Sequence, residues 1–594
     1  MRNVLCLVLL APILALAAGT TQPVTALAPE NGTMNVAPLP APAPADQREP
    51  NIPPRALVGS LDTIGGTTYD WMANGPRMRM IVNSPEYGVH ALWMYSTATT
   101  GTDFPDRNMR YNFYDISAHA WNWLDPDHMQ SGVNVFGKRA GYGNIDADPT
   151  TGNAVIGGHV AVGGGSDITP SVARDAAPGA GIFEYCDSTE LGICQWPRTS
   201  VGQDGQIDIF PITAAYALSY SHIAAGNWPT FSTPVTGIVP SPGFPTHNMA
   251  SSKVSSKVSL VWEISTNVPE DAYQSHSTDG GITWDSPWTL DPPVAFGNGS
   301  DTLTSFHITS LFPWYDAQDK FHVVCNLIPQ VNDTAYIIPS QIWHYCPDNA
   351  EPWSRIHIAG CAPENLQAAV GYNASYACRP SIGQDNDGNL FVAWEQFDSA
   401  NVELTTSRLR ADIFASRSTN NGVTWGDGLK LTDAGTHSMR FPIIIDQAVD
   451  GGSDEDTVFI LFEDDSISGF FVQTEGPATP NPVVVLKIPG NQIPPAPPAV
   501  AEQRPATSVR LDAVANPNPF GGRTQISYSL PRPGDVSLVV YDAAGRPVQT
   551  LVSGRREAGR YTATWDAHDV AAGVYFYTLT SGKASITRKL ILAD

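Results

Sequence analysis

The 594-residue sequence contains few of the motifs that hold a metal ion and little of the positive charge that binds nucleic acid. Its seven cysteines form no C-x-x-C pair, and none has a histidine at zinc-ligand spacing. No G-x-S-x-G, H-E-x-x-H or phosphate-loop motif occurs. Lysine and arginine number 33 against 58 aspartates and glutamates, and the formal charge of -25 opposes binding to nucleic acid or to an anionic membrane. The composition therefore predicts no metal, no cofactor and no nucleic-acid partner.

Long apolar stretches are also scarce, and the one that stands out begins the chain. Residues 1–19, "MRNVLCLVLLAPILALAAG", place Arg2 before an apolar run that ends in small residues. This pattern is typical of a secretory signal peptide and is too short for a stable membrane span. The sequence therefore predicts an exported protein without a membrane-spanning segment, located at the cell surface or outside the cell.

Proline-rich stretches divide the rest of the chain. Residues 20–55 and 490–507 are rich in proline and alanine and are expected to be extended linkers. Between them, residues 56–489 contain short apolar runs rich in Val, Ile, Phe and Trp, separated by Asp/Gly/Ser turns. Such runs predict strands, and no segment there has a convincing helical pattern. Residues 508–594 then form a separate small module.

Six cysteines remain after the signal peptide, and an even number in an exported chain favours disulfides. Six cysteines permit 15 connectivities, and we expect the local pairs. These pairs are Cys186 with Cys194, Cys325 with Cys346, and Cys361 with Cys378.

A short motif, S-x-D-x-G-x-x-W, recurs in the middle region. It is complete in "STDGGITW", has Asn in place of Asp in "STNNGVTW", and is degenerate in "CPDNAEPW". The residues concerned are Ser277, Asp279, Gly281 and Trp284; Ser418, Asn420, Gly422 and Trp425; and Asp348 and Trp353. A motif that repeats along the chain is more often an element of the fold than a catalytic site. Asp can accept amide hydrogen bonds across a turn, Gly can adopt positive φ, and Trp can pack on a sheet.

Polar turns followed by apolar strands recur with a similar period, centred near residues 86, 150, 255, 318, 387 and 454, with one long insertion between the second and third. Six repeats of this size predict a six-bladed β-propeller, an all-β fold. The segment "RALVGSLDTIGG", residues 55–66, is expected to supply the outer strand that closes the ring. The recurring motif resembles the Asp box, or BNR repeat, of sialidase-like propellers. That resemblance implies a structural turn on the outside of a blade, away from any active site.

Basic residues precede these turns and are expected near the inner ends of the blades, where propellers bind ligands. They are Arg77, Arg79, Arg139, His247, His307, Arg379 and Arg440. An inward-pointing cluster would select an acidic ligand, because guanidinium groups bind carboxylates bidentately. Sialidases hold the sugar carboxylate with three arginines, but their early F/Y-R-I-P motif is absent from this sequence. The alternative is that each arginine pairs with a neighbouring carboxylate as part of the architecture.

Three glutamates occupy one repeat position after an apolar strand: Glu263, Glu395 and Glu463. One of them could act as a general acid or activate a tyrosine nucleophile if a dry site raised its pKa. Their repetition also fits a structural role, so the sequence assigns neither the acid nor the nucleophile.

The C-terminal module alternates apolar and polar residues at strand period, which predicts a small Ig-like β-sandwich. It resembles the C-terminal sorting domain of type IX secretion cargo and the FlgD-type Ig-like module. The matching residues include Asn516, Pro517, Asn518, Pro519, Phe520, Gly573, Tyr575 and Lys589. The resemblance implies recognition by bacterial secretion machinery, and the alternative is an ordinary Ig-like spacer.

Three functions remain open at this point. The first is a non-catalytic surface or secreted propeller that binds a glycan or a surface protein. The second is a sialidase-like exo-glycoside hydrolase that holds an acidic sugar through Arg379, Arg440 and Arg139. The third is an adhesion or scaffold protein without a small ligand.

Overall fold

The computed structural model describes residues 27–28, 32–33 and 51–593, with short internal gaps. The gaps are residues 74–75, 102, 163–167, 189, 214–216, 237–244, 265–271, 295, 297–305, 332–333, 362–364, 367, 453–454, 498–511, 517, 519, 531, 558 and 583. The predicted signal peptide and most of the first linker lie outside the described residues. The chain divides into two compact units, Met1–Pro497 and Pro498–Asp594.

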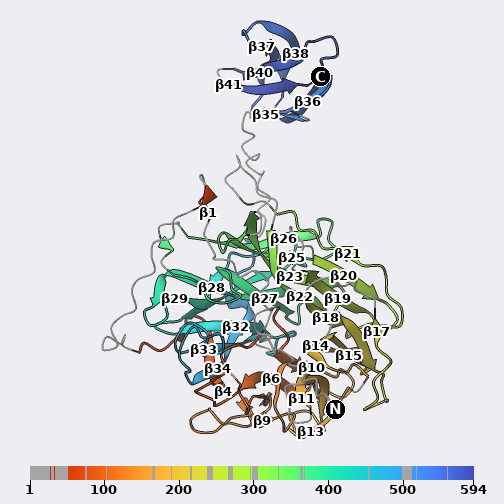
Figure 1. Cartoon of the computed structure of the whole chain (residues 1–594), viewed down its shortest axis with the longest axis vertical. Coiled ribbons are helices and arrows are strands. Elements are labelled where there is room, and N and C mark those ends of the chain that lie inside the picture. The colour runs from red at the N-terminus through yellow and green to blue at the C-terminus, as the bar shows by residue number, and fades with distance from the viewer. Residues whose placement is uncertain are drawn as a thin grey trace, which may run out of the picture. The chain divides into compact units, whose positions relative to one another are not determined.

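Seven antiparallel sheets of four or five strands build the first unit, and they follow one another along the chain (Figure 1). Their strands, sheet by sheet, are β5 (Ile81–Ser84), β6 (Gly88–Tyr95), β7 (Asn108–Asp115), β8 (Ala120–Trp121) and β9 (Val133–Asn134); β10 (Ala140–Ala147), β11 (Ala154–Ala161), β12 (Ile168–Asp175) and β13 (Phe183–Asp187); β14 (Cys194–Val201), β15 (Ile207–Thr213), β16 (Ser219–Ile223) and β17 (Val235–Thr236); β18 (Pro245–Ser251), β19 (Val258–Ile264), β20 (Ala272–Ser277) and β21 (Trp288–Thr289); β22 (Phe306–Tyr315), β23 (Phe321–Val331), β24 (Thr334–Ala335), β25 (Ser340–Tyr345) and β26 (Trp353–Ala359); β27 (Ala377–Gln384), β28 (Leu390–Glu403), β29 (Arg408–Ser418) and β30 (Leu429–Lys430); and β32 (Ser438–Ile444), β33 (Thr457–Asp465), β34 (Asn481–Pro489) and β4 (Ser60–Thr67).

The first strands of these sheets form a ring. Each first strand from β5 to β32 contacts the first strand of the next sheet. The ring closes between the last sheet and the first, where the Asn83 amide at the end of β5 donates to Asp446 just after β32 at 2.9 Å. Successive sheets around a common centre make this unit a β-propeller, with the first strands innermost (Figure 1).

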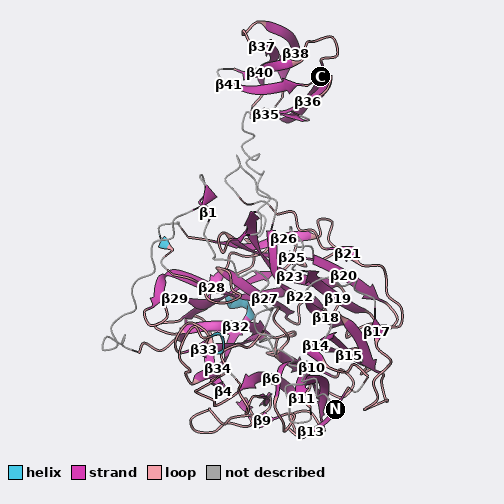
Figure 2. Ribbon diagram, in the orientation of Figure 1, coloured by secondary structure: helices cyan, strands magenta, loops and turns pink. Residues whose placement is uncertain are grey.

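The other elements of the first unit are short. They are the paired strands β1 (Leu27–Ala28) and β2 (Gly32–Thr33), the paired strands β3 (Arg55–Ala56) and β31 (Thr432–Asp433), and the 3₁₀ helices η3 (Phe471–Gln473) and η4 (Gly490–Gln492). Figure 2 shows strand throughout the described chain and very little helix. No helix of the described residues is long and apolar enough to cross a membrane.

The predicted number of six blades is wrong, because the described residues form seven sheets. The seventh is β14–β17, and it accounts for the long insertion between the turns near residues 150 and 255. This sheet lacks the recurring S-x-D-x-G-x-x-W motif, and its third strand, β16, is only five residues long. The other repeat signal is present, because the polar turn at residues 202–206 is followed by the apolar strand β15, but the sequence-based count of six did not include it.

The predicted closure of the ring is confirmed. Strand β4 precedes the first complete sheet in sequence, yet it pairs antiparallel with β34 as the outermost strand of the last sheet. The register runs from Thr67 opposite Asn481 to Ser60 opposite Lys487. The two ends of the propeller sequence are thus held in one sheet, which leaves no unpaired edge on β34.

The S-x-D-x-G-x-x-W segments form turns that close on themselves after the third strand of their sheets. In the first, Ser277 Oγ accepts from the Gly281 amide at 2.8 Å, and Asp279 accepts from the Thr283 amide at 2.9 Å. Trp284 Nε1 donates to the Gly281 carbonyl at 3.1 Å. The second motif repeats these contacts with Ser418, Asn420, Gly422 and Trp425. Gly281 and Gly422 have φ of 81° and 75°, which favours glycine.

All six cysteines outside the predicted signal peptide are free, so the predicted disulfides are wrong. The strand register explains one case. Tyr345 lies opposite Val323, so Cys346 is displaced by about three residues, or ~10 Å, from Cys325 along the sheet. Disulfide-linked Cα atoms lie within about 7 Å of one another. In another pair, the Cys378 thiol is already engaged, because it donates to Glu395 at 3.3 Å.

The second unit is built from two antiparallel sheets around its own core. One contains β35 (Asp512–Asn516), β36 (Arg523–Leu530) and β39 (Gly559–Asp566), and the other contains β38 (Pro547–Arg556), β37 (Gly534–Asp542), β40 (Gly573–Ser581) and β41 (Ala584–Leu592). Phe520 packs on Trp565 inside this core, with ring centroids 5.4 Å apart. Asn518 joins the beginning of the module to its end, because its side chain contacts the Lys589 carbonyl at 2.8 Å and the Ile591 amide at 2.8 Å.

The remaining residues predicted for sorting have different positions in this module. Tyr575 on β40 donates from its hydroxyl to the Ala571 carbonyl at 2.6 Å. Gly573 begins the same strand. Pro517 and Pro519 lie outside the described residues.

Candidate functional site

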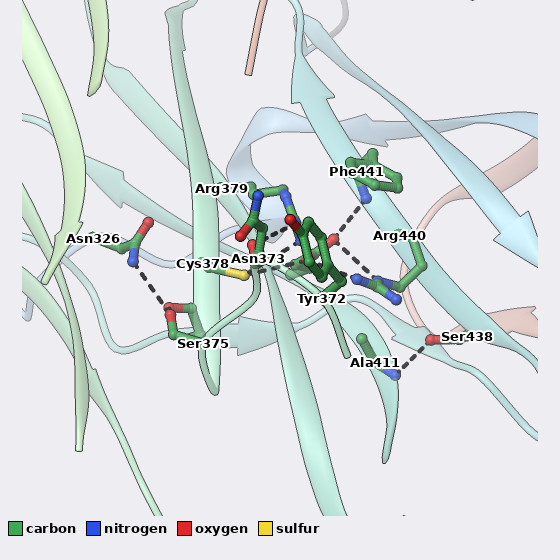
Figure 3. Close-up of polar contacts among 12 residues, drawn as sticks. Asn326, Tyr372, Asn373, Ser375, Cys378, Arg379, Ala411, Ser438, Arg440 and Phe441 are labelled. Carbon is green, nitrogen blue, oxygen red and sulfur yellow. Dashed lines mark hydrogen bonds and ion pairs between the residues drawn. The ribbon is translucent and has the colours of Figure 1, made fainter. Parts of the chain in front are cut away.

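Three arginine side chains from different parts of the propeller converge on one aromatic ring. Arg379 lies on β27, Arg440 lies on β32, and Arg77 precedes β5. Their guanidinium carbons lie 4.6, 5.5 and 5.5 Å from the centroid of the Phe441 ring. Each arginine is at most 2% exposed. We refer to these three arginines and Glu395 as the arginine centre, part of which is drawn in Figure 3.

A β-bulge positions Arg379 in β27, and a second β-bulge positions Phe441 in β32. The register of β27 shifts between Cys378 and Ser381, and that of β32 shifts between Arg440 and Ile443. Within these bulges Arg379 and Phe441 adopt φ of 57° and 56°, and a proline follows each of them. A bulge inserts one residue into the ladder and redirects its side chain, and it is common beside functional sites. Positive φ is unfavourable for such bulky residues, so the surrounding structure must hold them there.

The same bulge recurs in two other inner strands. Tyr142 in β10 and Trp196 in β14 have φ of 48° and 45° at corresponding register shifts. The dipeptides Trp196-Pro197, Arg379-Pro380 and Phe441-Pro442 thus mark one structural position in three sheets. This recurring residue-proline dipeptide is the sequence signal that could have located the site.

Glu395 links two of the arginines. Its carboxylate forms an ion pair with Arg379 and lies 3.5 Å from Arg440 Nε, and it accepts from the Phe441 amide at 2.7 Å. Burial alone would raise the pKa of Glu395, but Arg379, Arg440 and the Phe441 amide outweigh burial and hold the pKa at about 2. Burial lowers the pKa of Arg379, yet the charge of Glu395 outweighs it and the pKa is raised. Glu395 is therefore ionised near neutral pH and is a poor proton donor.

Arg77 has no comparable partner. Among the described residues its Nε and Nη1 make no hydrogen bond, and its Nη2 reaches only the Met80 sulfur at 3.5 Å. Burial and repulsion from Arg379 lower the pKa of Arg77 to about 9, which still leaves it charged at neutral pH. Arg440 Nη1 likewise has no hydrogen-bond partner in this part of the structure. A buried cation without a partner is costly, so these groups point to an anion that would complete the site.

Three buried carboxyl groups interact with the charge of Arg440, and burial is the largest influence on the pKa of each. Burial raises the pKa of Asp70 to about 7, against the hydrogen bonds that it accepts from the Phe471 and Val472 amides. Burial, with repulsion from Asp70, raises the pKa of Glu463 and of Asp465 well above the ordinary range. Counting Glu463 as neutral, the arginine centre carries three guanidinium charges against the single carboxylate of Glu395.

The other residues predicted for the site lie elsewhere. Arg139 donates to the carbonyls of Phe104 and Asp103 at 3.1 and 3.0 Å. His247 is buried against the carbonyls of Trp196 and Phe210, and burial lowers its pKa well below the ordinary value, which leaves it neutral. His307 is half-buried on β22. Glu263 is buried on β19, opposite Thr246 of the same sheet.

Comparison with known proteins identifies the second unit. Residues 515–593 match the family model of the secretion system C-terminal sorting domain. This match places the protein at the cell surface or in the extracellular space, and it implies contact with the secretion machinery. No curated protein matches the chain.

Several solved structures are similar to the propeller at low identity. A polysaccharide lyase described as an ulvan lyase has a TM-score of 0.42 and 13% identity, covering 70% of this chain and 100% of that chain. The α-L-arabinanase of Penicillium chrysogenum has a TM-score of 0.36 and 9% identity, covering 74% and 99%. The NanB sialidase of Streptococcus pneumoniae has a TM-score of 0.36 and 10% identity, covering 73% and 71%. The propeller assignment itself rests on the sheet order and the ring of inner strands.

Proposed function

We propose that this exported protein binds a carboxylate-bearing glycan at the arginine centre without cleaving it. The observation that carries the proposal is Arg77, a buried and charged guanidinium with two nitrogens that lack a hydrogen-bond partner among the described residues. Glu395 is already shared by Arg379 and Arg440. A ligand carboxylate could accept two parallel hydrogen bonds from one guanidinium group, which supplies the missing anion with defined geometry.

Aromatic side chains beside the arginine centre support a sugar as the carrier of that carboxylate. Tyr372 is half-buried, and its ring lies against Trp71 with centroids 5.2 Å apart. The next residue, Asn373, accepts a hydrogen bond from Arg379 Nη2 through its carbonyl at 2.7 Å. Aromatic faces next to a few fixed polar groups are a usual combination in ligand sites. The three guanidinium groups themselves are nearly fully buried.

The test compares an oligosaccharide that contains glucuronic acid with its carboxyl-reduced counterpart, together with a sialoside and its neutral parent sugar. We expect the secreted protein to bind an acidic member in calorimetry, and Arg77→Gln to weaken that binding about 100-fold, since a charge-assisted pair is lost in a dry site. Arg174→Gln is the matched control, because Arg174 is partly exposed and pairs with Glu184 on the outer part of a sheet. Equal binding of the acidic and reduced sugars, or an Arg77→Gln variant that binds normally, would contradict the proposal.

The raised pKa of Asp70 favours a second candidate, a glycoside hydrolase acting on an acidic sugar. A carboxyl group with a pKa of about 7 can donate a proton at neutral pH, as a general acid must. Mass spectrometry of the same mixtures distinguishes the two functions. Cleavage products that disappear in Asp70→Asn, while binding persists, would replace the binding proposal by the hydrolase. If neither binding nor cleavage is detected, the arginines have a structural role and the scaffold function is favoured.

A further inference from the structure

A cavity lies at the opposite ends of the inner strands from the arginine centre. Its volume is about 560 Å³. Its wall comes from the ends of the inner strands and the turns that follow them in six of the seven sheets, beginning with Asn83 and ending with Asp446 and Gln447. Along β27, Arg379 and the lining residue Gln384 are five residues apart, or ~17 Å. The cavity is therefore a separate site and not an extension of the arginine centre.

Arg79 bridges two inner strands close to this cavity. Its Nη1 donates to the Ile444 carbonyl at 2.9 Å and its Nη2 donates to the Ile382 carbonyl at 3.1 Å, so it bridges β32 and β27. Its guanidinium also stacks on Phe312 at 5.0 Å. A smaller cavity of about 60 Å³ shares lining residues with the larger one and includes Arg79 in its wall.

The strongest hydrogen-bond donors of the cavity wall are already engaged. Lys253 Nζ donates to the carbonyls of Ala147 and Val201 at 2.9 and 2.7 Å and pairs with Asp146 at 2.9 Å. Gln384 Nε2 donates to Gln447 at 2.7 Å. Gln447 Nε2 in turn donates to the Asn386 side chain at 2.7 Å. The lysine and the amide donors of the wall are thus hydrogen-bonded to neighbouring protein groups and are not available to a ligand.

Hydrogen-bond acceptors remain. Asn83 is only 7% exposed, and its Oδ1 has no hydrogen-bond partner among the described residues. Asp446 Oδ1 accepts the Asn83 amide, so the two side chains lie together in the wall. Glu86 is exposed and Asp148 is half-buried, and both add carboxylates to the lining. A buried acceptor without a partner requires an explanation, and a ligand that donates hydrogen bonds supplies one.

We propose that this cavity binds an organic cation, an ammonium or guanidinium group carried by a free polyamine or by a lysine or arginine side chain of a peptide. The lining carboxylates Glu86, Asp148 and Asp446 outnumber the cations near them, because Lys253 pairs with Asp146 and Arg79 interacts with Asp446 alone among the three. Two aromatic rings, Trp314 and the 44%-exposed Tyr87, also line the cavity and offer faces for a cation. No group of three His, Cys, Asp or Glu side chains in the described chain could hold a metal ion, which favours an organic cation.

The experiment uses calorimetry on the full chain with matched probes. Spermidine and N-acetylarginine amide carry the required charge, and N-acetylcitrulline amide has nearly the same shape as the arginine probe without it. We expect binding of at least one cationic probe and none of the citrulline probe at the same concentration. The stronger of the two cations identifies the source, a polyamine or a basic side chain.

Variants of the wall complete the test. Asp446→Asn is expected to weaken cation binding about tenfold, because a charge-assisted hydrogen bond is lost. Glu86→Gln removes an exposed rim charge with little effect on folding and is expected to weaken binding by a smaller factor. Glu351→Gln, an exposed acid outside the cavity, should leave binding unchanged. Equal binding of the citrulline probe, insensitivity to Asp446→Asn and Glu86→Gln, or no binding of either cation at millimolar concentration would overturn the proposal.

Discussion

Replacing Glu395 by glutamine is expected to lower the free energy of unfolding by about 3–5 kcal/mol, since it removes one partner of a buried ion pair. Glu395 is fully buried, and it is the carboxylate that pairs with both Arg379 and Arg440. The glutamine side chain keeps the volume but leaves both guanidinium groups without a counter-charge. Urea denaturation of the secreted protein at neutral pH, followed by tryptophan fluorescence, measures the change.

Two variants serve as controls for that result. Glu351→Gln changes the same formal charge at an exposed position and is expected to shift stability by less than about 0.5 kcal/mol. Combining Glu395→Gln with Arg379→Gln removes one of the uncompensated cations and should recover part of the loss. A Glu395→Gln variant as stable as the wild type would mean that the pair contributes nothing to the folded state.

The acid dependence of stability provides an independent check on the same carboxylate. The folded-state pKa of Glu395 is about 2, below its ordinary value of 4.5. A depressed pKa contributes stability that is complete above pH 4.5 and is lost as the pH falls through 2, because the unfolded chain takes up the proton first. We therefore expect the stability difference between the wild type and Glu395→Gln to shrink between pH 5 and pH 2. A difference that stays constant over this range would contradict the assigned pKa.

The sequence allowed part of this site to be predicted, because repeat position determines strand register. The spacing that brought Arg379 and Arg440 together as candidates reflects nearby places at the starts of β27 and β32, where Arg440 corresponds to Cys378, the residue before Arg379. Glu395 and Glu463 were likewise expected at one repeat position, and each lies opposite an inner-strand residue of its own sheet. Register within a sheet is a local property that short-range sequence patterns encode.

The environment of each residue could not be predicted in the same way. Glu395 and Glu463 share a repeat position, yet the pKa of Glu395 is lowered by two arginines and that of Glu463 is raised by burial and Asp70. Arg379 lies on the strand next to Glu395 in the same sheet, but Arg440 comes from the next sheet and Asp70 from the segment before β5. Contacts of the latter kind leave no periodic trace in the sequence. Arg77 was recognised as basic, but its lack of a partner is visible only after the sheets are packed.

Deletion of residues 51–67 is expected to prevent the propeller from forming a stable, closed ring. The deleted segment includes β4, which pairs with β34 over seven residue pairs and buries Ile64 completely. At about 0.5–1.5 kcal/mol for each backbone hydrogen bond, the lost ladder alone approaches the 5–15 kcal/mol that stabilises a typical folded domain. The deletion also exposes β34 as an unpaired edge, so size-exclusion chromatography should show aggregates and thermal melting should lose its cooperative transition.

Deletion of residues 20–50, which leaves β3 and β4 in place, is the matched control and should keep a monomeric propeller with a near-normal melting temperature. If the 51–67 deletion instead melted cooperatively near the wild-type temperature, sheet pairing at β34 would not be what holds the ring closed, and the packing of inner strands β32 and β5 through Asn83 and Asp446 would have to suffice.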